Sequence, residues 1–189
     1  MVFAERGFEA TSVEEIAARA GVSKPIVYEH FGGKEGLYAV IVDREVEHIV
    51  SRIMEAITTG SARERLEQAV LAFLTYVQDR PGGFALLLRD APESRRSGQM
   101  PVLMFDLADR VGDVFTEQFR GAGFDARSAP IYAHALVGMV AFVGQWWTES
   151  KKPPPAEAVA SHVAALAWMG LRHLPKRPAL VVGRQGRKK

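Results

Sequence analysis

The hydrophobic pattern of the chain is typical of helices. Over long stretches apolar side chains recur every three or four positions instead of alternating with polar ones, which predicts amphipathic α-helices and no strands. Glycine and proline fall at the ends of these stretches, and we expect the polar stretch 92–99 to form a loop. The pattern predicts an all-α fold with helices at about residues 2–6, 12–20, 23–31, 34–58, 62–79, 84–90, 102–120, 128–149 and 155–174.

Residues 11–38 have the spacing of a helix-turn-helix. A helix of about nine residues, a tight turn at Gly21 and Val22, and a second short helix are the parts of this motif in the required order. We expect Ala17 and Gly21 to be small because the two helices approach each other there. Four apolar side chains are expected to point inward and fix the crossing angle: Ile16, Val22, Val27 and Phe31.

The beginnings of these two helices carry capping signals. Ser12 and Glu15 have the spacing of a capping box, but Thr11 and Glu14 have the same spacing. The sequence therefore leaves two possible starts for the first helix of the motif. Ser23 is the expected N-cap of the second.

The exposed positions of the second helix suit DNA. Lys24 could reach a phosphate or a guanine edge, and Ile26 offers an apolar contact for a thymine methyl group. Tyr28 and His30 could donate to phosphate oxygens, and Lys34 adds a cation at a helix N-terminus, which favours anions. Geometry alone also allows these residues to be an ordinary helix surface.

A family resemblance joins these observations. Residues 3–37, FAERGFEATSVEEIAARAGVSKPIVYEHFGGKEGL, resemble the N-terminal domain of the TetR family of bacterial transcriptional regulators. The remaining helices resemble the family only in number and length. Because family members have a fuller first helix, that helix is expected to be truncated here. The resemblance implies a DNA-binding surface made of Ser12, Glu14, Lys24, Pro25, Ile26, Tyr28, His30 and Lys34.

The resemblance also implies a division of labour along the chain. A helix-turn-helix DNA-binding domain is expected over 1–38 and a helical ligand-binding and dimerisation domain over 39–175, followed by a basic, disordered tail over 176–189. The expected function is that of a ligand-responsive regulator, a repressor that a largely apolar small molecule releases from a palindromic operator. Its expected partners are double-stranded DNA, the effector and a second copy of the chain.

Two sets of residues within the larger domain follow from the same resemblance. Family members commonly keep a cavity among their middle helices, although aromatic residues at helical spacing also form plain cores. The expected pocket is lined by Phe73, Phe84, Leu87, Met104, Phe105, Phe142 and Trp146. The last two helices are expected to pair with a second copy, although small residues there would also suit internal packing. The expected dimer interface contains Ala135, Gly138, Val159, Val163, Leu166 and Gly170.

The distribution of charge leaves a second interpretation open. The whole chain has a formal charge of +2, but the first 50 residues hold five basic and nine acidic side chains, a formal charge of −4. The tail from residue 176 instead carries six cations and no acid. Because the predicted DNA-reading unit is acidic, a dimeric helical ligand-binding protein that has lost DNA recognition remains the alternative.

An enzyme is the function that the sequence favours least. The absence of cysteine excludes disulfides, thiolate metal sites and cysteine nucleophiles. The five histidines lack metal-ligand spacing, and no nucleophile-elbow or phosphate-loop motif is present. No apolar run approaches the roughly 18 residues that a membrane span needs. We expect a cytoplasmic protein without catalytic activity, metal, cofactor or membrane partner.

Overall fold

The computed structural model describes residues 2–57, 59–88 and 102–179, with the backbone alone at 102–104 and 106. Every regular element in these ranges is a helix, which confirms the all-α prediction. The elements are α1 (Val2–Arg6), α2 (Val13–Ala20), α3 (Lys24–Phe31), α4 (Lys34–Ala56), α5 (Ala62–Asp79), α6 (Pro81–Leu88), α8 (Val102–Gly121), the short 3₁₀ helix η1 (Ala126–Ser128), α9 (Ala129–Glu149) and α10 (Ala156–Arg172).

The start of α6 is the main departure from the predicted boundaries. The sequence predicts this helix from residue 84, but it begins at Pro81. Proline is well suited to the first turn of a helix because the N–H that it lacks would have no partner there. Gly83 lies inside the helix, and a Cβ at this position would lie 2.9 Å from the Tyr76 hydroxyl oxygen. The predicted loop at 92–99 is outside the described residues.

Hydrogen bonds decide which residue caps α2. The Ser12 hydroxyl accepts a hydrogen bond from the Glu15 backbone N–H at 3.2 Å, as an N-cap does. The Thr11 hydroxyl instead donates to the Gly7 carbonyl oxygen at 2.6 Å. Of the two predicted caps, Ser12 is therefore the one used.

Gly21 ends α2 for a reason other than the predicted one. Its φ of +67° is left-handed, and its N–H is directed to the carbonyl oxygens of Ala17 and Ala18. A Cβ on this residue would meet no atom within 4 Å, so close helix approach does not require glycine here. The glycine serves the left-handed backbone of the helix end, which other residues adopt only at a cost.

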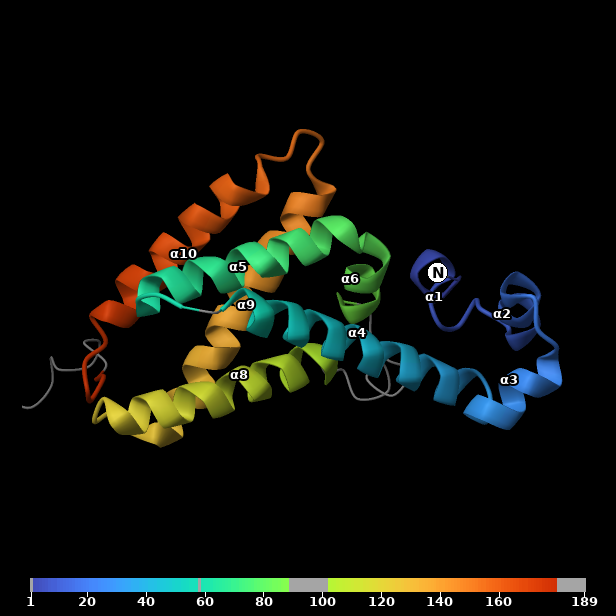
Figure 1. The fold of residues 1–189 in the computed structure, drawn as a ribbon, viewed down its shortest axis with the longest axis horizontal. Coiled ribbons are helices and arrows are strands. Elements are labelled where there is room, and N and C mark those ends of the chain that lie inside the picture. Colours follow the sequence, from blue (N-terminus) through green and yellow to red (C-terminus); the bar gives the residue numbers. More distant parts are fainter. Residues whose placement is uncertain (1, 58, 89–101, 180–189) are drawn as a thin grey trace, which may run out of the picture.

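The molecule consists of a small head and a larger body joined by α4. The head, α1–α3, lies at one end of α4, and α5, α6 and α8–α10 form the body (Figure 1). α4 is 23 residues long and packs against α3 in the head and α5 in the body. Within the body, α10 lies along α5 and α8 pairs with α9. Buried apolar side chains form one connected core from Phe3 in the head to Val163 in the body.

A buried charged cluster joins α4, α5 and α6. Glu45 on α4 is only 4% exposed and accepts hydrogen bonds from the Tyr76 hydroxyl and from Nε of Arg80, each at 3.1 Å. A second Arg80 nitrogen pairs with the other carboxylate oxygen. Burial raises the pKa of the Tyr76 hydroxyl, and Glu45 raises it further, so this hydroxyl stays protonated as a donor. Because α6 also packs against α1, the cluster ties the head to the body.

Candidate nucleic-acid interface

The inward side of the helix-turn-helix is mostly as predicted. Val27 of α3 is buried, and Ile16 and Phe31 are partly buried against the same core. Val22 was predicted to point inward and is instead 39% exposed. It lies in the turn directly after the left-handed Gly21, outside both helices, so the helical periodicity used to predict its direction does not apply there.

The residues predicted to face DNA lie on or beside α2 and α3 and form a largely exposed surface. All of them are exposed except Lys34, which is partly buried. Among them are two large side chains, Ile26 and Tyr28, that contribute nothing to the apolar core. Exposed residues of this size on a helix-turn-helix are suited to contacts in a major groove.

Lys24, at the start of α3, is held by two neighbours. Its ammonium group forms an ion pair with the Glu14 carboxylate on α2 and lies 5.6 Å from the centre of the Tyr28 ring. The hydrogen bond lowers the pKa of Glu14 and raises the pKa of Lys24. Both groups are therefore charged at neutral pH, and the structure brings Glu14, Lys24 and Tyr28 into one small group.

Lys34 holds the head together. Its ammonium group donates to the Phe8 carbonyl oxygen at 3.2 Å and lies 4.3 Å from the centre of the Phe8 ring. These contacts tie the turn after α1 to the first residue of α4. The sequence suggested a phosphate contact for this side chain but contained no sign of its structural role.

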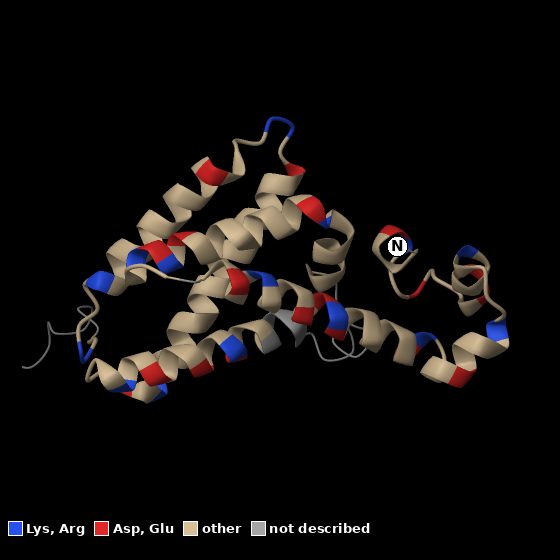
Figure 2. Ribbon diagram, viewed as in Figure 1, with Lys and Arg blue, Asp and Glu red and all other residues tan. Residues whose placement is uncertain are grey.

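The arginines of the head are also paired with acids. Arg19 pairs with Glu5 at 2.7 Å and with Glu15 at 3.3 Å, and Arg6 pairs with Glu15 at 3.2 Å. Each of α1, α2 and α3 carries both acidic and basic side chains (Figure 2). The head is not a simple basic patch, and its cations are already engaged within the protein.

Of the residues predicted to line a pocket, those that the structure describes are partly buried in the core and partly exposed at the surface. Phe73, Phe84 and Leu87 are buried, and the two phenylalanine rings pack edge-on with centres 5.7 Å apart. Phe142 is 75% exposed, Trp146 is 54% exposed and Phe105 is also exposed. The Met104 side chain is outside the described part of the structure. The aromatic residues therefore divide between the core and the outer surface of the body.

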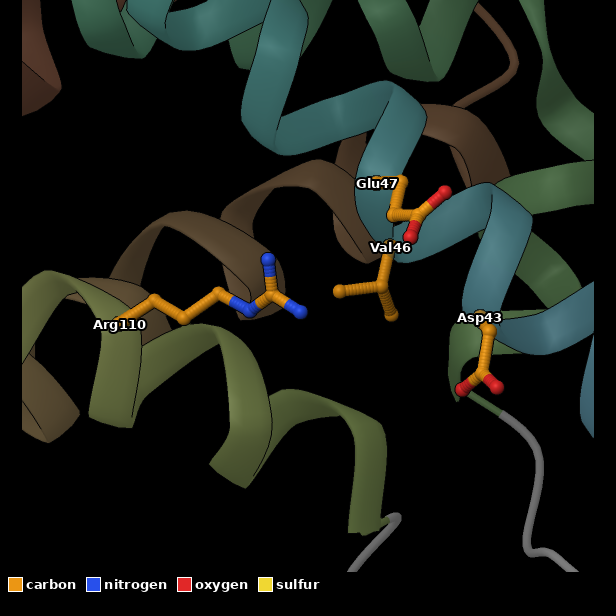
Figure 3. A pocket seen from close by; sticks show the side chains of 4 residues that line it. All are labelled: Asp43, Val46, Glu47 and Arg110. Atoms are coloured by element: carbon orange, nitrogen blue, oxygen red, sulfur yellow. The ribbon is translucent and has the colours of Figure 1, made fainter.

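A small cleft lies elsewhere, between α4 and α8. It has a volume of about 250 Å³ and is lined by Asp43, Val46, Glu47 and Arg110 (Figure 3). Asp43 and Glu47 are one turn apart on α4, and Arg110 extends toward them from α8. This lining is charged rather than aromatic. Among the described residues, no group of three or more acidic or histidine side chains is placed to hold a metal ion.

The predicted dimer residues divide in the same way. Val159 and Val163 are buried within the protomer, where α10 packs on α5, so they are not available to a second copy. Exposed positions include Ala135, Gly138, Leu166 and Gly170. Sequence reasoning missed three neighbours of these positions, Ile131, Phe142 and Met169, which are also exposed. We call this set of exposed residues, together with Trp146, the α9–α10 apolar face.

Comparison with known proteins identifies the family. The family model described as "Bacterial regulatory proteins, tetR family" matches residues 1–41, and "Tetracyclin repressor-like, C-terminal domain" matches residues 52–180. The chain belongs to the TetR family of transcriptional regulators. This TetR-family chain is 33% identical over 177 residues to the HTH-type transcriptional activator FasR of Mycolicibacterium smegmatis, an alignment that covers 92% of the chain and 80% of that relative.

Two further relatives support the assignment at different lengths. A crystal structure of a TetR-like transcriptional regulator from Rhodococcus sp. RHA1 superposes with a TM-score of 0.70 at 29% identity, covering 92% of this chain and 91% of that one. The HTH-type transcriptional repressor KstR2 of Rhodococcus jostii is 34% identical over 70 residues, or 36% of this chain and 34% of that protein. A TetR-family helix-turn-helix regulator is a DNA-binding protein, which assigns α2 and α3 as the DNA-binding motif.

Proposed function

We propose that this TetR-family protein is a dimeric, ligand-responsive regulator that binds a palindromic operator with the α3 surface of each head. The observation that carries the proposal is the exposure of Ile26 and Tyr28 on a helix that packs inward through Val27 and Phe31. Two heads about one helical turn of DNA apart would match two half-sites. We expect the protein to repress transcription, whereas the FasR relative is named an activator. A promoter–reporter fusion distinguishes the two, since a repressor lowers and an activator raises expression of the reporter.

The DNA contact is tested by the variant Ile26→Asp. Ile26 is exposed, so the change should leave the thermal unfolding temperature within about 2 °C of the parent while a carboxylate enters the groove-facing surface. We expect affinity for the DNA that flanks the protein's own gene to fall more than about tenfold, since one good base contact is worth about 1–3 kcal/mol. Fluorescence anisotropy at several salt concentrations measures the loss.

The matched control is Met54→Asp, because Met54 is also exposed but lies on α4 outside the head. It should bind DNA like the parent. Equal affinities for all three proteins would refute the assignment of α3 as the reading helix. If the parent binds no DNA under any of these conditions, the alternative of a ligand-binding protein without DNA recognition gains the support of the acidic, internally paired head.

Dimerisation is proposed through the α9–α10 apolar face. Phe142 is 75% exposed and Leu166 is 67% exposed, a costly arrangement for large apolar side chains in water. At Gly138 and Gly170 a Cβ would meet no atom within 4 Å, so a partner helix has room to approach. Within residues 126–149, the most apolar stretch of 18 residues has a mean hydropathy of 1.3, enough by composition for a membrane span, yet only 22% of that stretch is buried in the protomer. Pairing with a second copy would cover that surface.

Charged residues on this face should separate the dimer. We expect Phe142→Glu to raise the dissociation constant of the dimer by on the order of thirtyfold or more, because truncating or charging an interface centre typically costs 2 kcal/mol or above. Size-exclusion chromatography with light scattering across a dilution series measures the change. Val114→Glu on α8 is the control, since Val114 is an exposed apolar residue outside this face. A parent that is monomeric throughout the series would overturn the proposal.

An effector is proposed to bind the body beside α4. The cleft between α4 and α8 supports this, because α4 also carries the head and a ligand there would bear directly on its position. The charged lining of Asp43, Glu47 and Arg110 favours a polar effector over the largely apolar one expected from the sequence. Thermal-shift measurements distinguish these two classes. Free amino acids represent polar effectors and fatty acids represent apolar ones, and the class that binds should raise the unfolding temperature.

A further inference from the structure

The ion pair between Glu14 and Lys24 has an unusual place in the head. It joins the second residue of α2 to the first residue of α3, across the turn of the helix-turn-helix. Both side chains are about half exposed or more, at 61% and 48%, so the pair lies on the surface and not in the core. The Tyr28 ring, 5.6 Å from the ammonium group, supports the lysine from a second side.

The other cations of the head already have partners within the protein, so Lys24 matters more for DNA affinity. In residues 2–38, all of which the structure describes, Arg6 and Arg19 are occupied by Glu5 and Glu15, and Lys34 by Phe8. Lys24 is thus the cation that leads the reading helix, and it too has a carboxylate partner. An ion pair this exposed to solvent contributes little to folding, so stability does not explain an acid at this position.

We propose that Glu14 is a residue that limits non-specific DNA binding by withholding Lys24 from the DNA backbone. Phosphate contacts supply essentially all of the affinity for non-operator DNA, whereas base contacts supply the discrimination. A carboxylate that neutralises the leading lysine of each head therefore weakens binding to arbitrary sequences more than binding to the operator. The inference rests on the proposed DNA-binding function and adds to it a residue that limits the affinity for DNA of arbitrary sequence.

The test compares Glu14→Gln with the parent on a 40-base-pair duplex of random sequence. The full chain is titrated by fluorescence anisotropy at salt concentrations from about 50 to 200 mM, a range over which one phosphate contact changes affinity about threefold. Glutamine keeps the size of the side chain but releases Lys24. We expect Glu14→Gln to tighten binding at the lowest salt by about threefold or more, and to steepen the slope of log affinity against log salt by about 0.9 for each bound head.

Two controls separate this effect from a general change of charge. Glu29→Gln makes the same charge change on α3, where Glu29 is exposed and forms no ion pair with any described residue. It should change the affinity less and leave the salt slope unaltered. In a Lys24→Gln background, Glu14→Gln should lose its effect on the slope, because no lysine remains to be released.

The outcomes are distinct from those that test DNA binding itself. If the parent binds the random duplex and Glu14→Gln behaves like Glu29→Gln, this inference is overturned while the proposed function stands. If Glu14→Gln raises affinity equally with and without Lys24, simple repulsion by the carboxylate replaces the proposed restraint of the lysine. If no variant binds any duplex, the proposed function fails first and the inference falls with it.

Discussion

The Phe84→Ala variant is expected to lose about 3–5 kcal/mol of unfolding free energy, the cost of removing a fully packed aromatic side chain. Phe84 is only 2% exposed and packs edge-on against Phe73 at 5.7 Å. Gly144 on α9 closes the other side, since a Cβ there would lie 3.3 Å from the Phe84 ring and 3.2 Å from the Phe73 ring. Chemical denaturation at a fixed protein concentration measures the loss.

This measurement distinguishes a packed core from a preformed pocket at the same residues. If Phe84 lined an empty ligand cavity, its truncation would remove few contacts and cost little. Phe84→Leu, which retains much of the volume, should lose less than half as much as Phe84→Ala. A cost below about 1 kcal/mol for the alanine variant would restore the pocket that the sequence suggested at this position.

The free energy of unfolding of the Arg80→Met variant is expected to be about 3 kcal/mol lower than that of the parent. This value is near the lower end of the range for breaking a buried ion pair. The change leaves the Glu45 carboxylate, 4% exposed, without its cation. The Tyr76 hydroxyl would still donate to it, and the Arg80 side chain is 42% exposed, so water can partly replace the guanidinium. These two facts are why we expect the lower end. Thermal and denaturant unfolding both report the change.

The neighbouring pair of Arg52 and Asp79 provides a matched control. It also joins α4 to α5, at 2.6 Å, but on the exposed surface. Arg52→Met should therefore cost less than about 1 kcal/mol. Adding Glu45→Gln to Arg80→Met should recover part of the loss, because a neutral amide is less costly to bury than an unpaired carboxylate. Equal losses for Arg80→Met and Arg52→Met would show that the buried cluster has no special role.

The sequence was sufficient to predict the helix-turn-helix but not the contacts made by its side chains. The DNA-binding motif could be predicted because each of its signals is local: the cap at Ser12, the glycine turn and the spacing up to Phe31. The pairing of Lys24 with Glu14 was out of reach, since it depends on how α2 crosses α3. Glu45 did leave a signal, an acid on the same side of α4 as Val42 and Ile49, which periodicity alone would have placed in the core.

The order of helices, most of their ends and the position of the helix-turn-helix were determined by the sequence itself, because hydrogen bonding and helical periodicity act over a few residues. Only the tertiary structure decided which apolar side chains face inward in α9 and α10. These helices are apolar on most sides, so periodicity does not distinguish the side that packs on α5 from the side left exposed. That choice placed Val159 and Val163 in the core, and Phe142 and Trp146 on the outside.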